Sequence, residues 1–273
     1  MREKKSFCAS TLFLLFLSIG FVSAAAATTR IMPLGDSITQ GETSGEPNPD
    51  RQVSYRKALG EKLLAAGYDI DFVGSLNSGS DILGLKAADH EGWPGYEADQ
   101  VRDEVFDWLQ LNPPDVVLLH IGTNDISGSQ PVADIVAEVE EILDEIFIYS
   151  TEITVILARI INRSTFSQDT NDFNNLLPGM VNAHPSKDKI LIVDMEAGAG
   201  IDYDLWPAGD MNDPIHPYQN PISGTAPGYE KMANVWFSAL QDVLPDPDPP
   251  AADNKDDDDD SGCFISAAAN GSF

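Results

Sequence analysis

The chain has 273 residues, of which 44 are acidic and 16 are lysine or arginine, and its formal net charge at pH 7 is −28. This length fits one large domain with tails, or two small domains. So acidic a chain disfavours nucleic acid, anionic membrane surfaces and strongly anionic substrates as partners, because binding them needs basic patches.

The N-terminus predicts a secretory signal peptide over residues 1–27. Arg2, Lys4 and Lys5 give a positive start, and an apolar stretch over residues 11–22 follows it. Small residues that suit cleavage close the segment, and the apolar stretch is too short to span a membrane. We therefore expect a secreted protein, extracellular or periplasmic, with no membrane span and with a mature part that is more acidic still.

The body of the chain alternates two patterns. Short apolar runs predict buried strands at Arg30–Leu34, Ile70–Val73, Val116–His120, Ile153–Ile161 and Ile190–Val193. Helical spacing of apolar residues predicts helices at Tyr55–Ala66, Glu97–Leu109, Val132–Phe147 and Gly228–Leu244. Strands with little alternation, separated by amphipathic helices, indicate a mostly parallel sheet. We expect one α/β domain over residues 28–244, a flavodoxin-like three-layer α/β/α sandwich with a five-stranded parallel sheet.

Residues 245–273 predict an acidic linker and tail. Proline and aspartate dominate the first part, and such a composition cannot build a core. The final stretch, CFISAAANGSF, resembles the CFI-box tail at the ends of some exported bacterial proteins. It contains Cys263, which would be the one cysteine left after cleavage, so no disulfide within the chain is expected.

Four short motifs carry residues suited to ester hydrolysis. They are GDSIT at 35–39, HEGWPG at 90–95, GTND at 122–125 and DPIHP at 213–217. The first and third lie just past predicted strands, and open parallel sheets bind ligands at the carboxyl ends of their strands. Each motif alone is weak evidence, but their order within an α/β pattern points to one site.

The residue types in these motifs complement one another chemically. Ser37 is a weak nucleophile until a base takes its proton. His216 can be that base, because a neutral imidazole titrates near working pH. Asp213 is placed to reach the other ring nitrogen and to hold the correct tautomer. The sequence therefore predicts a catalytic set of Ser37, Asp213 and His216.

With these motifs the chain resembles the SGNH, or GDSL-type, hydrolases, whose four blocks are marked by serine, glycine, asparagine and histidine. The matching residues are Ser37, Gly95, Asn124 and His216. Within that superfamily the chain is most similar to the acetyl xylan esterase type of carbohydrate esterase family 3. Segments such as RIMPLGDSITQG, HEGWPGY and VVLLHIGTNDI carry this resemblance, which extends over nearly all of residues 30–244.

The resemblance implies the SGNH hydrolase fold and a secreted serine esterase that needs no cofactor. Its substrate would be an acetylated polysaccharide such as xylan, or a small acetyl ester, cleaved through an acetyl-Ser37 intermediate. The resemblance also implies an oxyanion hole formed by the backbone N–H groups of Ser37 and Gly95 and the side-chain amide of Asn124.

Other interpretations of these residues stay open. Asn124 and Gly95 could be ordinary turn residues, and Gly92 could take the role given to Gly95. Trp93 and Trp206 could contact sugar rings, although packing is the more frequent role of tryptophan.

The function also has alternatives. One is a lysophospholipase or thioesterase of the same fold, acting on lipid, and another is a non-catalytic carbohydrate-binding protein. No metal-ligand spacing, P-loop or dinucleotide motif appears, so neither a metal nor a nucleotide is expected. The sequence does not determine the polysaccharide or the oligomeric state.

Overall fold

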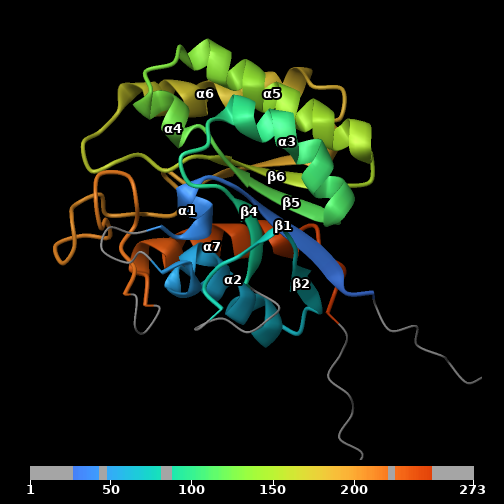
Figure 1. Cartoon of the computed structure of the whole chain (residues 1–273), viewed down its shortest axis with the longest axis horizontal. Coiled ribbons are helices and arrows are strands. Elements are labelled where there is room, and N and C mark those ends of the chain that lie inside the picture. The colour runs from blue at the N-terminus through green and yellow to red at the C-terminus, as the bar shows by residue number, and fades with distance from the viewer. Residues whose placement is uncertain (1–26, 43–47, 81–87, 221–224, 248–273) are drawn as a thin grey trace, which may run out of the picture.

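A parallel β-sheet runs through the middle of the computed structural model, which describes residues 27–42, 48–80, 88–220 and 225–247 (Figure 1). Nearly all of the predicted signal peptide and most of the predicted acidic tail, including Cys263, lie outside the described residues. Within those ranges, every helix is too short or too polar to cross a bilayer.

The sheet has five parallel positions. Its parallel strands are β1 (Thr29–Gly35), β2 (Ile70–Phe72), β4 (Asp89–Gly92), β5 (Val116–His120), β6 (Thr154–Arg159) and β7 (Ile190–Asp194). The order is β4-β1-β5-β6-β7, and β2 pairs with the first half of β1 on the same edge that β4 pairs with further along. A short antiparallel strand, β3 (Leu76–Asn77), extends the sheet beyond β4. The predicted parallel sheet is confirmed, with β2 and β4 sharing one position.

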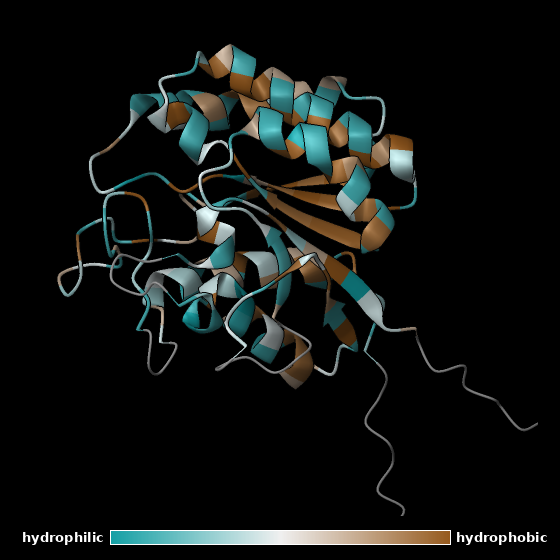
Figure 2. Cartoon of the chain, in the orientation of Figure 1, coloured by the Kyte–Doolittle hydropathy of each residue, from teal (hydrophilic) through white to brown (hydrophobic). Residues whose placement is uncertain are grey.

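Helices cover both faces of the sheet (Figure 1). One layer holds α3 (Ala98–Leu111), α5 (Val132–Tyr149) and α6 (Gln168–Ala183), and the other holds α2 (Ser54–Ala65) and α7 (Pro227–Gln241). Each layer packs its own apolar cluster against the sheet, and the central strands β5 and β6 are brown in Figure 2. The chain therefore forms the predicted three-layer α/β/α sandwich.

The strand β4 and the helix α6 were not among the elements predicted from sequence, for different physical reasons. The strand β4 has a polar sequence, and His90 and Glu91 within it are fully buried. The helix α6 contains Pro178 and is rich in asparagine, although Phe173 and Leu177 place an apolar stripe on the core. Polar strands and helices with a proline lack the patterns from which the other elements were predicted.

Two short helices begin at the carboxyl ends of neighbouring strands. The helix α1 (Ser37–Gln40) follows β1, and α4 (Thr123–Ser127) follows β5. Because β1 and β5 pair in parallel, these two helices start at the same edge of the sheet. This edge holds the first and third of the sequence motifs.

Candidate active site

The sequence around Ser37 places its hydroxyl at the end of β1. Asp36 caps α1, because its carboxylate oxygen Oδ1 accepts a hydrogen bond of 2.9 Å from the backbone N–H of Ile38. Ser37 is the first residue of α1, and only 4% of its surface is exposed. The cap holds the turn between strand and helix, so Ser37 has a defined position at the carboxyl edge of the sheet.

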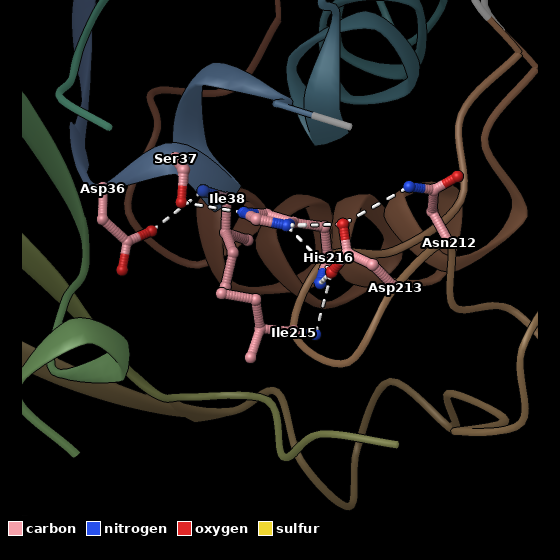
Figure 3. Close-up of polar contacts among 7 residues, drawn as sticks. All are labelled: Asp36, Ser37, Ile38, Asn212, Asp213, Ile215 and His216. Atoms are coloured by element: carbon pink, nitrogen blue, oxygen red, sulfur yellow. Dashed lines mark hydrogen bonds and ion pairs between the residues drawn. The ribbon is translucent and has the colours of Figure 1, made fainter. Parts of the chain in front are cut away.

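Ser37, His216 and Asp213 form a chain of hydrogen bonds, shown in Figure 3. The distance from Ser37 Oγ to His216 Nε2 is 2.9 Å, and His216 Nδ1 lies 2.9 Å from Asp213 Oδ2 and 3.0 Å from Oδ1. The fold thereby joins the first motif to the fourth, 179 positions apart in sequence. This is the geometry in which a histidine can take a serine proton while a carboxylate orients the ring.

The loop that carries His216 is fixed by its own hydrogen bonds. Asp213 Oδ1 accepts from the backbone N–H groups of Ile215 (3.0 Å) and His216 (2.9 Å). The backbone N–H of Asn212 donates to the carbonyl of His216 at 2.8 Å. One carboxylate therefore shapes the loop and also contacts the ring that the loop presents.

The electrostatics of Asp213 and His216 suit a charged pair. Burial raises the pKa of Asp213, but hydrogen bonding and attraction to His216 outweigh it, so this pKa lies well below its usual range. For His216, burial lowers the pKa, while the hydrogen bond and charge of Asp213 raise it, and the net result is a pKa above its usual value of 6.5. The pair therefore stabilises a protonated imidazole ring.

Asp36 has a different electrostatic character, although it lies next to the candidate nucleophile. Burial raises its pKa to about 7, and the hydrogen bond from Ile38 acts in the opposite direction. Its contact with the Ile38 N–H gives Asp36 a structural role as the cap of α1.

The structure separates the roles of Gly92 and Gly95. The N–H of Gly92 donates to His90 Nδ1 at 2.9 Å, and a Cβ on Gly92 would lie 2.6 Å from the backbone nitrogen of Gln40. Gly92 is thus committed to packing against α1. Gly95 is exposed and has φ +81°, which favours glycine, and a Cβ there would meet nothing within 4 Å. Of the two glycines, Gly95 therefore has its backbone open to a ligand.

Asn124 holds the loop of Gly95 next to α4. Its side-chain Nδ2 donates to the carbonyl of Tyr96 at 2.8 Å, which leaves the second hydrogen of this amide for another acceptor. The neighbouring Asp125 accepts from the backbone N–H of Ala98 at 2.9 Å through Oδ1. These two contacts tie the segment that directly follows the second motif to the third motif.

The two tryptophans named from sequence lie in different surroundings. Trp93 donates its indole N–H to Glu91 at 3.0 Å, and its ring stacks on Trp108 with 5.4 Å between centroids. Trp206 is 47% exposed and stacks on Tyr218 at 4.3 Å with an angle of 6° between the rings.

Tyr218 was missed in the sequence analysis, although it lies only two residues after His216. Its proximity to the predicted base is the signal that could have identified it.

Among the described residues, no group of three or more histidine, cysteine, aspartate or glutamate side chains is arranged to hold a metal ion.

Comparison with known proteins gives consistent matches. Residues 34–220 match the model of the GDSL-like Lipase/Acylhydrolase family. A multidomain esterase of Ruminococcus flavefaciens is 29% identical over 260 residues, which is 84% of this chain and 30% of that protein. A putative endoglucanase X of Acetivibrio thermocellus is 24% identical over 53% of this chain and 58% of its own length. The chain thus spans about a third and about three fifths of these two relatives.

Solved structures share the fold. The family 3 carbohydrate esterase of Clostridium thermocellum has a TM-score of 0.62 and 29% identity, and the match covers 79% of this chain and 96% of that one. A carbohydrate esterase family 3 protein from Talaromyces cellulolyticus has a TM-score of 0.64 and 24% identity, over 79% of this chain and 98% of that one.

Proposed function

The chain belongs to the GDSL-like lipase/acylhydrolase family and is by family a carboxylic ester hydrolase, and on this premise we propose that it removes acetyl groups from carbohydrate. The observation that carries the proposal is the hydrogen-bonded chain of Ser37, His216 and Asp213. The similarity to a family 3 carbohydrate esterase supports carbohydrate as the substrate class. The signal-like N-terminus, outside the described residues, supports secretion, which suits a polymer that cannot enter a cell.

Acylation begins at the hydrogen bond between Ser37 and His216. His216 Nε2 takes the Ser37 proton as Oγ attacks the acetyl carbonyl carbon, and the Asp213 carboxylate stabilises the resulting imidazolium. The tetrahedral intermediate collapses when the bond to the sugar oxygen breaks and His216 returns the proton to that oxygen. The products of this step are a free sugar hydroxyl and acetyl-Ser37.

Deacylation repeats the same proton transfers with water. His216 takes a proton from water, whose oxygen attacks the acetyl-Ser37 carbonyl, and acetate leaves as Ser37 recovers its proton. In both steps negative charge develops on the carbonyl oxygen. The backbone N–H groups of Ser37 and Gly95 and the free amide hydrogen of Asn124 are the proposed donors to it, each worth roughly 3–4 kcal/mol of barrier.

A stacked aromatic pair next to the catalytic loop supports carbohydrate as the substrate. Trp206 exposes about half of its surface and rests on Tyr218, which lies two residues beyond His216. A flat, exposed ring held rigidly by another ring suits contact with the apolar face of a sugar. We assign this role mainly to Trp206, since the Trp93 ring is already held by Glu91 and Trp108.

Acetate release from a panel of acetylated xylan, pectin, chitin and peptidoglycan tests the substrate class. We expect release from at least one polysaccharide, and a preference for acetyl over longer 4-nitrophenyl esters. The matched control is Ser37→Ala, which should abolish both activities. A preference for long acyl chains would instead support the lipid-directed alternative, and no hydrolysis of any ester would support the non-catalytic one.

A further inference from the structure

Arg163 lies in the loop between β6 and α6, and this loop contacts two sides of the candidate active site. Its guanidinium donates to the carbonyl of Thr123 at 3.4 Å and to Ser127 Oγ at 3.3 Å, both on α4, the helix that carries Asn124. The next residue, Ser164, donates its backbone N–H to the carbonyl of Pro214 at 2.9 Å, inside the loop of the candidate base. Arg163 therefore lies where the proposed oxyanion donors and the catalytic loop come together.

The guanidinium of Arg163 bonds to oxygens of the protein that carry no charge. Within the described ranges, Arg163 forms no ion pair, whereas Arg102 pairs with Asp103 and Glu141. Partial burial lowers the pKa of Arg163, and the more distant charge of Asp169 acts in the opposite direction. A partly desolvated charge of this kind favours an anionic partner from outside the chain.

The chemistry of the guanidinium indicates the kind of anion. Arginine has five N–H donors in a planar fork that matches a carboxylate, and only two of these donors are accounted for by the contacts with Thr123 and Ser127. On a carbohydrate, the carboxylate would belong to a uronic acid. The net charge of −28 disfavours a polymer with a carboxylate on every sugar, so an occasional uronate on a neutral chain fits better.

We propose that Arg163 is a specificity residue that binds the carboxylate of a uronic acid near the acetylated sugar. The inference rests on the proposed function, because it names the substrate class of the same site. The enzyme would then release acetyl groups faster next to a uronate than on an undecorated chain. Arg163 would act on substrate binding, while Ser37 and His216 would carry out the chemistry.

The test compares kcat/KM for three acetylated substrates: neutral xylo-oligosaccharides, the same oligosaccharides with a glucuronic acid branch, and galacturonan oligosaccharides. The wild-type chain should prefer the branched substrate over the neutral one by about 10-fold or more, as a charge-assisted pair would give. Arg163→Gln should reduce this preference to about 1, mainly through KM, and Arg163→Lys should restore part of it. The control Arg102→Gln, on the outer surface of α3, should leave the preference at the wild-type value.

Several results would overturn the inference. One is a wild-type enzyme that shows no preference for the branched over the neutral substrate. Another is an Arg163→Gln variant in which kcat/KM falls equally on all substrates, because a purely structural role predicts that result. A strong preference for galacturonan would still identify Arg163 as a uronate-binding residue. It would contradict the inference that the substrate polymer carries only occasional uronates. If 4-nitrophenyl acetate were hydrolysed but no carbohydrate were deacetylated, the proposed function would fail and this inference with it. Arg163-dependent hydrolysis of a lysophospholipid would assign the guanidinium to phosphate instead.

Discussion

At the scale of single residues, opposing influences set the proton affinity of the His216 ring. Burial favours the neutral ring, and Asp213 favours the charged ring by a hydrogen bond of 2.9 Å and by its charge. The attraction to Asp213 prevails, so the pKa lies above the ordinary 6.5. A base must be neutral to accept a proton, so activity is lost as pH falls through this raised pKa.

The pH dependence of kcat/KM tests this balance. For the wild-type chain we expect the acid limb of the profile to have its midpoint above pH 6.5. Asp213→Asn removes the charge that raises this pKa, so the midpoint should move to lower pH while the maximum falls by about 10-fold or more. The reaction of 4-nitrophenyl acetate can be followed over the whole range. An acid limb that does not move in Asp213→Asn would show that Asp213 does not set the pKa of the base.

At the scale of elements, one buried side chain joins the segments around the candidate nucleophile. Arg56, on α2, is fully buried and donates to five backbone carbonyls, those of Thr39, Gln40, Gln52, Ser78 and Ala88. Two of these carbonyls belong to α1, the helix that begins at Ser37. A single guanidinium therefore satisfies acceptors from the end of α1 and from three other segments at once.

Removal of this guanidinium should destabilise the fold strongly. In Arg56→Met, several buried carbonyls lose their donor, and we expect the free energy of unfolding to fall by about 3 kcal/mol or more. Arg102→Met, which removes a partly exposed arginine from α3, is the matched control and should change the free energy of unfolding by less than about 1 kcal/mol. Chemical denaturation followed by circular dichroism measures both. Equal losses in the two variants would rule out a special role for the Arg56 contacts.

The observed strands and helices also show which parts of the fold could be predicted from sequence patterns. The apolar runs predicted β1, β5, β6 and β7 within about two residues of their observed ends, because buried strands and amphipathic helices follow regular periods. Sequence periodicity did not predict the strand β4 or the helix α6, because the burial of their residues depends on hydrogen bonds and long-range packing. Thus Glu91 is buried in β4 because it accepts from the backbone of Ser75 and from the Trp93 indole.

At the scale of the whole molecule, the predicted sandwich is confirmed and explains why distant motifs converge. Ser37 and Asn124 follow adjacent parallel strands, which could be anticipated from their position after apolar runs. The contact of His216 with Ser37 depends on the path of the loop that carries His216. The order of the motifs suggested this contact but gave no distance. The position of Arg163 could not be anticipated, because it arises from a loop without a pattern. The catalytic and oxyanion roles stay predictions.

The net charge of −28 should make the stability of the whole chain depend on salt. Like charges repel one another in the compact state, and raising NaCl from about 0.01 M to 1 M shortens the screening length from about 30 Å to 3 Å. We expect Tm at pH 7 to rise by a few degrees over this range. Near the sequence pI of about 4.1 the net charge vanishes, so the rise should disappear there. An equal response at both pH values would show that charge repulsion is not its cause.

The central claim is that Ser37 carries the acyl group during turnover, and mass spectrometry of the quenched enzyme tests it most directly. The chain would be mixed with an activated acetyl ester, stopped in acid within milliseconds, digested and analysed for peptides that have gained one acetyl group. We predict an acetyl group on the peptide that contains Ser37, none on that peptide in Ser37→Ala, and a loss of at least a thousand-fold in kcat for that variant. Acetylation of a different residue during turnover, or wild-type turnover by Ser37→Ala, would contradict the account.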